Sequence, residues 1–181
     1  MNRVLLLALS LSLSGFAIAQ SPHTHQHSFS GAERWAHVFD DPARDTWQKP
    51  HEVIHALGLE PDAVVADLGS GTGYFSMRLA NMMTRGRVYG VDVEPDMVKY
   101  LAERAKREQR DNVLAITGTP DDPRLPEKVN LVLLVDVYHH IDDRERYFRN
   151  LRASLKPGGR YRLNTRHEFL PRQYFLVFES F

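Results

Sequence analysis

The sequence predicts an α/β fold, in which an open, doubly wound and mostly parallel sheet carries helices on both faces. Short, almost wholly apolar runs alternate with longer stretches whose apolar residues recur at helical spacing. Such runs are typical of strands buried on both faces of a parallel sheet, and their alternation with helices implies right-handed crossovers. The predicted strands are 63–67, 87–91, 113–116 and 131–135, and the predicted helices are 74–83, 95–107 and 144–155.

The segments around this alternating core are predicted from turn residues and periodicity. Residues 32–39 can form a short helix, a turn-rich connection follows, and an apolar stripe from Val53 to Leu59 predicts another helix. Lys156-Pro157-Gly158-Gly159 has the residues that end a helix, so it is expected to terminate the helix 144–155.

The first 19 residues have the pattern of an export signal. Arg3 supplies a positive charge, Val4 to Leu13 form an apolar run interrupted by serines, and Ala17-Ile18-Ala19 resembles a cleavage site. The alternative is an uncleaved membrane anchor, but the apolar run is about half of the ~20 residues that a spanning helix needs. We therefore expect cleavage near Ala19 and a periplasmic protein, or a cytoplasmic one if 1–19 is not a signal.

Residues 20–31 are polar, rich in histidine and without apolar periodicity, so we expect a disordered leader before a single domain at 32–181. His23, His25 and His27 alternate in this segment and can bind a transition metal weakly. We favour a solvated leader, because no nearby carboxylate or preformed element fixes ligand geometry. No metal site is therefore predicted.

The composition excludes several classes of function. The 181 residues contain 23 Lys and Arg against 23 Asp and Glu, so no global field attracts nucleic acid or an anionic membrane surface. Cysteine is absent, which excludes disulfides, thiolate metal sites and cysteine nucleophiles. A small molecule is therefore the expected partner, and the oligomeric state is not predicted.

A glycine loop follows the first predicted strand, where an open α/β sheet binds its ligand. Gly69, Gly71 and Gly73 are spaced G-x-G-x-G and follow Asp67, whereas a dinucleotide loop has the spacing G-x-G-x-x-G. A carboxylate at the strand end would repel a diphosphate but can hydrogen-bond a cationic ammonium group. This charge argument favours S-adenosylmethionine over a nicotinamide cofactor.

A second acid strengthens this interpretation. Asp92 ends the second predicted strand 25 positions after Asp67, close to the roughly 20 positions expected for an acid that holds ribose hydroxyls. Glu94 is the next candidate for this role. The alternative is that Asp92 or Glu94 caps the helix that begins at Pro95.

Over roughly 53–159 the chain resembles class I S-adenosylmethionine-dependent methyltransferases, which have a Rossmann-like fold. Val65 to Ser76 is similar to the first motif of that family, Gly90-Val91-Asp92 with Met97 to its second, and Leu155 to Gly159 to the entry into its fifth strand. The resemblance implies that the loop with the first acid holds the methionine end of the cofactor and that the second acid holds its ribose. By position these are Asp67, Gly69, Gly71 and Asp92, and Ser70, Gly73, Glu94 and Asp136 are expected to belong to the same cofactor site.

The chain departs from the family pattern where an acid often contacts adenine. Gly118 is followed by Thr119 and Pro120, so the adenine contact is expected to move to Asp121 or Asp122.

The end of the fourth predicted strand carries the candidate catalytic residues Asp136, His139 and His140. These side chains are expected beside the methyl group, where they can orient or deprotonate an acceptor. Histidine is the natural base near neutral pH, although one of the two can instead cap the loop or pack under the sheet.

The acceptor is expected to be a small molecule. The chain lacks the Asn/Asp-Pro-Pro-aromatic motif of adenine-N6 or cytosine-N4 methyltransferases, the cysteines that arsenic methylation needs and the basic stripe of an RNA-binding surface. Phe39, Trp47 and Tyr138 are candidates for the wall of its pocket, and packing is the alternative role for such aromatic residues.

The C-terminal part is shorter than a class I domain requires. Arg160 to Asn164 and Gln173 to Phe178 read as strands with a turn at 169–172, so an antiparallel hairpin is expected to complete the sheet. This shortening leaves part of one face for a partner to cover, or lowers stability. It also leaves open a catalytically weak S-adenosylmethionine-binding protein, and the second rival is a nicotinamide-dependent oxidoreductase.

Overall fold

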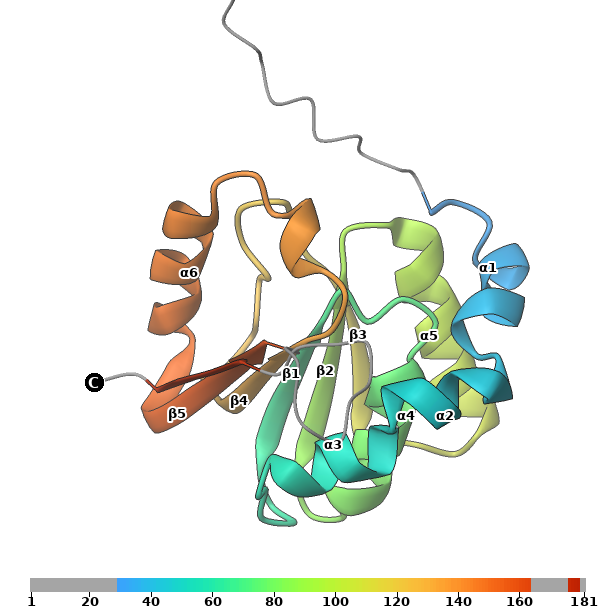
Figure 1. Cartoon of the computed structure of the whole chain (residues 1–181), viewed down its shortest axis with the longest axis horizontal. Helices are drawn as coiled ribbons and strands as arrows, with labels where there is room; N and C mark the ends of the chain where they lie inside the picture. The colour runs from blue at the N-terminus through green and yellow to red at the C-terminus, as the bar shows by residue number, and fades with distance from the viewer. Residues whose placement is uncertain (1–28, 164–175, 180–181) are drawn as a thin grey trace, which may run out of the picture.

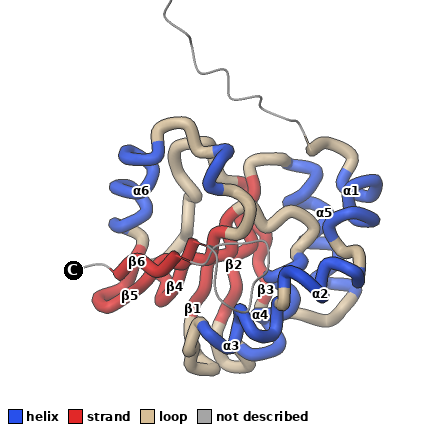
Figure 2. The backbone as a smooth tube through the Cα atoms, viewed as in Figure 1, coloured by secondary structure: helices blue, strands red, loops and turns tan. Residues whose placement is uncertain are grey.

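The fold is a six-stranded sheet in the order β3-β2-β1-β4-β5-β6, seen in a computed structural model that describes residues 29–163 and 176–179. Strands β1 to β5 are parallel, and β6 pairs antiparallel with β5. Figure 2 shows the strands as one continuous twisted layer. The strands are β1 (Val64–Leu68), β2 (Arg87–Asp92), β3 (Val113–Thr117), β4 (Val129–Leu134), β5 (Leu155–Leu163) and β6 (Leu176–Glu179).

Helices cover both faces of the sheet, which confirms the predicted fold class. One apolar core packs α3, α4 and α5 against one face, and a second core packs α6 against the other. Figure 1 shows α6 standing apart from the remaining helices. The helices are α1 (Ala32–Phe39), η1 (Pro42–Arg44), α2 (Asp45–Gln48), α3 (Pro50–Ala56), α4 (Tyr74–Met82), α5 (Pro95–Arg107), η2 (Tyr138–His140) and α6 (Arg144–Ala153).

Local chemistry explains where the longer helices begin. Pro95 occupies the first turn of α5, where its missing N–H costs nothing, and three basic residues lie in the last turn near the negative end of the helix dipole. Asp143 caps α6, because its carboxylate accepts the N–H of Arg146 at 3.0 Å.

The predicted end of α6 is wrong. The helix ends at Ala153, and the segment Lys156 to Gly159 lies inside β5 instead of between helix and strand. Leu155 pairs with Val129, and the register shifts before the next paired residues, so the Pro and Gly residues form an irregularity within the strand. Gly158 has a φ of 71°, which fits glycine in such a bulge.

The described chain begins before the predicted domain boundary at 32. The N–H of Phe29 donates to Glu94 Oε1 at 3.2 Å, and the N–H of Gly31 donates to Asp96 Oδ2 at 2.8 Å. The last residues assigned to the leader therefore lie against the start of α5. The predicted signal 1–19, the three alternating histidines and the predicted turn 169–172 lie outside the described residues.

Within the described ranges, no helix has the length and apolar character needed to cross a bilayer. The same ranges contain no cluster of three or more His, Asp or Glu side chains arranged to hold a metal ion.

Candidate cofactor and acceptor site

The glycine loop that joins β1 to α4 has the backbone conformation that glycine alone adopts easily. Gly69, Gly71 and Gly73 have φ values of 67°, 53° and 93°, all in the left-handed region. The N–H groups of Gly69 and Ser70 donate to the carbonyl of Val91 at 2.8 and 3.0 Å. These bonds hold the loop against the end of β2.

A cavity of about 700 Å³ lies over this loop, at the carboxyl ends of the parallel strands. This is the end at which open α/β sheets bind their ligands. The residues that were predicted from the sequence and line the cavity are Asp67, Gly69, Ser70, Gly71, Asp92, Glu94, Asp136, His139 and His140.

Two predicted cofactor residues do not line the cavity. Gly73 lies just outside, as the residue that precedes α4. Asp122 also lies outside the lining: its carboxylate accepts the N–H of Arg124 at 2.7 Å in an exposed turn, and Asp121 forms an ion pair with Arg146. The wall after β3 consists of Gly118, Thr119, Pro120 and Pro123, so neither acid is among the described residues that line the cavity, and a contact of either with adenine stays a prediction.

Asp92 is held in a fixed position at the end of β2. Its Oδ2 accepts the N–H of Gly71 at 2.8 Å, and its Oδ1 accepts the N–H of Glu94 at 3.0 Å. Burial raises the pKa of Asp92, while the backbone hydrogen bonds oppose this effect. Each carboxylate oxygen keeps further acceptor capacity that can face a ligand hydroxyl.

Asp67 is a buried carboxylate that forms no direct ion pair among the described residues, although the charge of Arg44 is near enough to lower its pKa slightly. The residue is 3% exposed, and the hydroxyl of Ser76 donates to its Oδ2 at 2.6 Å. Burial raises the pKa of Asp67 to about 7, and the nearby charge of Asp92 adds to this effect. No ion pair with Lys or Arg is found for Asp67 in the described chain. A cationic ammonium group in the cavity would supply the missing countercharge.

Two buried hydroxyl groups of the loop indicate whether the site can accommodate a polar cofactor. Ser70 Oγ and Thr72 Oγ1 are buried and have no hydrogen-bond partner among the described residues. Both residues line the cavity. Because a buried hydroxyl without a partner is costly, this arrangement fits a ligand that carries hydrogen-bonding groups.

The end of the cavity at which the sequence predicts the acceptor lies beyond β4. Asp136 has a φ of 56°, a conformation that is uncommon for a residue with a side chain and tends to occur at functional sites. His139 and His140 follow in η2, and their ring centroids are 4.0 Å apart. The ring of Phe29 lies edge-on to His140, with centroids 6.0 Å apart.

The N-terminal segment supplies residues that the sequence analysis missed or only partly identified. Phe39 and Trp47 line the cavity as predicted, whereas Tyr138 does not and instead contacts Arg144 outside it. Phe29 and Arg44 also line the cavity, although neither was predicted to. No spacing signal marks Arg44, because it precedes the glycine loop in a short irregular stretch.

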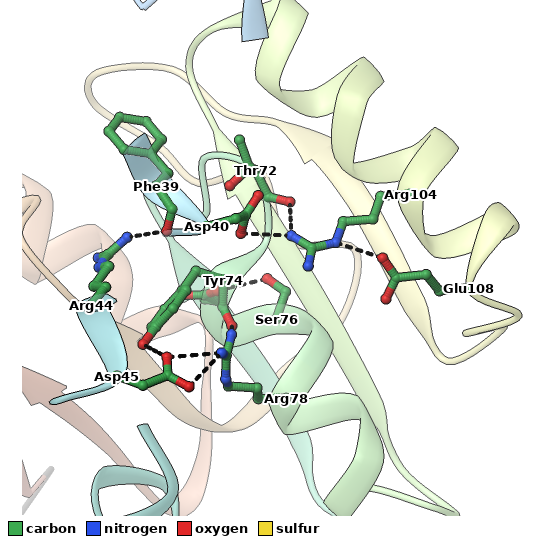
Figure 3. A network of polar contacts seen from close by, with 11 residues as sticks. Phe39, Asp40, Arg44, Asp45, Thr72, Tyr74, Ser76, Arg78, Arg104 and Glu108 are labelled. Atoms are coloured by element: carbon green, nitrogen blue, oxygen red, sulfur yellow. Dashed lines mark hydrogen bonds and ion pairs between the residues drawn. The ribbon is translucent and has the colours of Figure 1, made fainter. Parts of the chain in front are cut away.

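Polar contacts join this N-terminal segment to the loop (Figure 3). Arg104 on α5 donates through Nη1 to Asp40 at 2.8 Å and to the carbonyl of Thr72 at 3.1 Å. The hydroxyl of Tyr74 donates to Asp45, to which Arg78 also donates at 3.0 Å. The segment before β1 is thus held beside the glycine loop from two sides.

Curated relatives share part of this chain. It is 32% identical over 104 residues to the arsenite methyltransferase of Halobacterium salinarum, covering 56% of this chain and 27% of that protein. It is 30% identical over 104 residues to the malonyl-[acyl-carrier protein] O-methyltransferase of Hahella chejuensis, covering 56% of this chain and 36% of that protein. The chain therefore spans about a third or less of the length of these relatives.

The fold has a counterpart among solved structures. A SAM dependent methyltransferase from Aquifex aeolicus superposes with a TM-score of 0.67 at 23% identity, covering 74% of this chain and 71% of that one. Nothing in these comparisons supports a nicotinamide oxidoreductase. The family model described as a methyltransferase domain matches residues 66–161. Because this match covers more than half of the chain, the protein belongs to the class I S-adenosylmethionine-dependent methyltransferase family.

Proposed function

We propose that the protein binds S-adenosylmethionine over the glycine loop and transfers its methyl group to a small-molecule acceptor. The observation that carries this proposal is a cavity lined both by Asp92, which the N–H groups of Gly71 and Glu94 hold in place, and by two residues whose hydroxyls have no hydrogen-bond partner among the described residues, Ser70 and Thr72. Family membership supports the same cofactor.

Different residues of the cavity bind different parts of the cofactor. Asp92 accepts hydrogen bonds from the ribose hydroxyls, and Asp67 provides negative charge for the ammonium group of the methionine part. Ser70 and Thr72 supply hydroxyl groups on the loop side of the cavity. The bound cofactor supplies an electrophilic methyl group on its sulfonium.

The acceptor is a small molecule that enters at the end of β4. His139 and His140 line this end and can remove a proton from an acceptor hydroxyl or amine near neutral pH. We do not propose arsenite, which the name of one relative mentions, as the acceptor, because these 181 residues contain no cysteine.

Methyl transfer is tested with S-adenosylmethionine that carries a labelled methyl group, incubated with the protein and a metabolite extract. We expect label in a small-molecule fraction. Binding of the cofactor without turnover across a broad extract would instead favour the catalytically weak binding protein.

The histidines are tested separately from binding. We expect the double variant His139→Ala/His140→Ala to lower turnover about 100-fold or more, as removal of a general base does, while S-adenosylhomocysteine binds unchanged. The matched control is His55→Ala, which removes an exposed histidine on α3. Full turnover in the double variant would exclude the base role.

We also infer from the sequence that residues 1–19 direct export and are removed. Cell fractionation with mass measurement of the purified chain tests this, with an N-terminus near Gln20 expected outside the cytoplasm. A full-length chain found only in the cytosol would exclude export.

A further inference from the structure

Two adjacent histidines line the end of the cavity beyond β4, and their ring contacts differ. His139 and His140 both belong to η2, and both residues are exposed. An exposed histidine can adopt several rotamers, so it acts efficiently as a base only when its ring is held beside the acceptor. The contacts of the two rings therefore decide which histidine is better placed to be the base.

The ring of His140 contacts an aromatic side chain from the N-terminal segment. The ring planes of Phe29 and His140 are at 85°, and their centroids are 6.0 Å apart. This perpendicular arrangement is a preferred geometry for aromatic pairs, which attract each other beyond the effect of burial. The backbone under the ring is also held, because the N–H of His140 donates to the carbonyl of Val137 at 2.9 Å. In the described chain, the ring contact of His139 is with His140 itself.

Phe29 is held from two directions. Its N–H donates to Glu94 Oε1 at 3.2 Å, directly before α5. Its ring packs against two rings of α1, with centroid distances of 5.1 Å to Trp35 and 5.8 Å to Phe39. Those two rings stack on each other with their centroids 5.5 Å apart. The position of Phe29 at the wall of the cavity is therefore defined both by α1 and by the residue that precedes α5.

Helix α1 is in turn joined to the main fold. It lies beside α5 (Figure 1), and Asp40, which follows α1, accepts a hydrogen bond from Arg104 of α5 at 2.8 Å. A series of contacts thus runs from α5 through α1 and Phe29 to His140. It connects a helix that packs against the sheet with a side chain at the end of the cavity beyond β4.

We propose that Phe29 is a positioning residue that holds the ring of His140, so that His140 and not His139 takes the acceptor proton. The inference rests on the proposed function and deepens it by assigning the base. In the step, a lone pair of the acceptor oxygen or nitrogen forms the bond to the methyl carbon, the electrons of the carbon–sulfur bond return to sulfur, and His140 accepts the proton. The products are the methylated acceptor, S-adenosylhomocysteine and a protonated histidine.

NMR of protein labelled at histidine tests the contact without any acceptor, and His139→Ala and His140→Ala assign the two ring signals. We expect Phe29→Leu, which keeps an apolar side chain but not the aromatic ring, to shift the His140 ring protons toward the position of a solvent-exposed histidine. Phe29→Tyr keeps the ring and should leave them near their wild-type position. His55 is an internal control, because it is exposed on α3 outside the cavity and its signal should not move.

Turnover is measured at saturating S-adenosylmethionine as label transferred to the small-molecule fraction of a metabolite extract. We expect His140→Ala to lower the rate about 100-fold or more and His139→Ala to lower it less than about threefold. Phe29→Leu should lower the rate about three- to tenfold, as loss of an aromatic pair does, and Phe29→Tyr should stay within about twofold of the wild type. The affinity for S-adenosylhomocysteine should change less than about threefold in each variant.

Tyr138→Leu is the matched control. Tyr138 directly precedes His139 in η2, but its ring contacts Phe148 and Arg144 outside the cavity. The same change from an aromatic residue to leucine should therefore leave turnover within about twofold of the wild type at this position.

An unchanged His140 signal in Phe29→Leu would overturn the proposal. So would a turnover loss in His139→Ala that equals or exceeds the loss in His140→Ala, or a loss in Phe29→Tyr as large as in Phe29→Leu. If Phe29→Leu does not fold, Phe29→Met takes its place in both measurements. If the wild type transfers no label, the proposed function fails, and the NMR comparison still decides whether Phe29 holds His140.

Discussion

At the scale of single residues, the protonation of Asp67 sets a pH dependence. Burial raises its folded pKa to about 7 from the ordinary value of 3.8, so the folded state binds this proton more tightly than the unfolded state. The contribution of Asp67 to stability is complete below the unfolded pKa and is lost as the pH rises through about 7. The loss is at most a few kcal/mol, at about 1.4 kcal/mol per pKa unit.

We therefore predict that Asp67→Asn, which keeps the shape of the side chain and its hydrogen bond with Ser76, removes this loss of stability at rising pH. Between pH 5 and pH 8 the unfolding free energy of the wild type should fall relative to that of the variant, as measured by urea denaturation at each pH. Parallel pH profiles of the two proteins would show that Asp67 is ionised throughout.

At the scale of elements, the glycine loop depends on residues that cannot carry a side chain. A Cβ at Gly73 would lie 2.4 Å from Leu101 Cδ1 on α5, in addition to the strain of a φ of 93°. We predict that Gly73→Ala lowers the unfolding free energy by about 2–4 kcal/mol, the sum of strain and overpacking.

Gly58→Ala is the control for this loss. Gly58 has a φ of 56° with nothing within 4 Å of an added Cβ, so only strain of about 1 kcal/mol is expected. If urea denaturation shows the same decrease in unfolding free energy for both variants, α5 does not pack tightly behind the loop.

Arg104 links α1 to the glycine loop, because it bonds both Asp40 and the carbonyl of Thr72. We predict that Arg104→Gln speeds hydrogen exchange in α1 about tenfold, since losing a part-buried charged hydrogen bond costs about 1–3 kcal/mol. Glu108→Gln removes a surface partner of the same arginine and should change exchange about twofold at most. Equal exchange in both variants would refute the link.

At the scale of the whole molecule, the periodic parts of the sequence predict most of the fold. Strands β1 to β4 and helices α4 and α5 follow from apolar runs and helical spacing, and the bounds of α5 agree with the prediction. The end of α6 could not be predicted, because Pro157 and Gly158 suit both a helix stop and a bulge, and the pairing of Leu155 with Val129 decides between them.

The residues that line the cavity were predicted near strand ends and only in part in the N-terminal segment. Asp67 lies near the end of β1, Asp92 ends β2 and Asp136 follows β4, so their meeting at one edge of the sheet can be predicted from the sequence. Phe29 and Arg44 reach the cavity only through tertiary packing of the N-terminal segment against α4 and α5, which leaves no periodic signal. Asp122 was predicted to contact adenine because it is acidic, but in the local turn its carboxylate accepts the N–H of Arg124.

The central claim is that the cavity over the glycine loop holds S-adenosylmethionine through Asp92. Calorimetric titration of wild type and Asp92→Asn with S-adenosylhomocysteine tests it most directly, with NAD as the comparison ligand. We predict saturable one-to-one binding by the wild type, at least about tenfold weaker binding by the variant and none of NAD. Absence of S-adenosylhomocysteine binding by the folded wild type, or binding unaffected in Asp92→Asn, would contradict it.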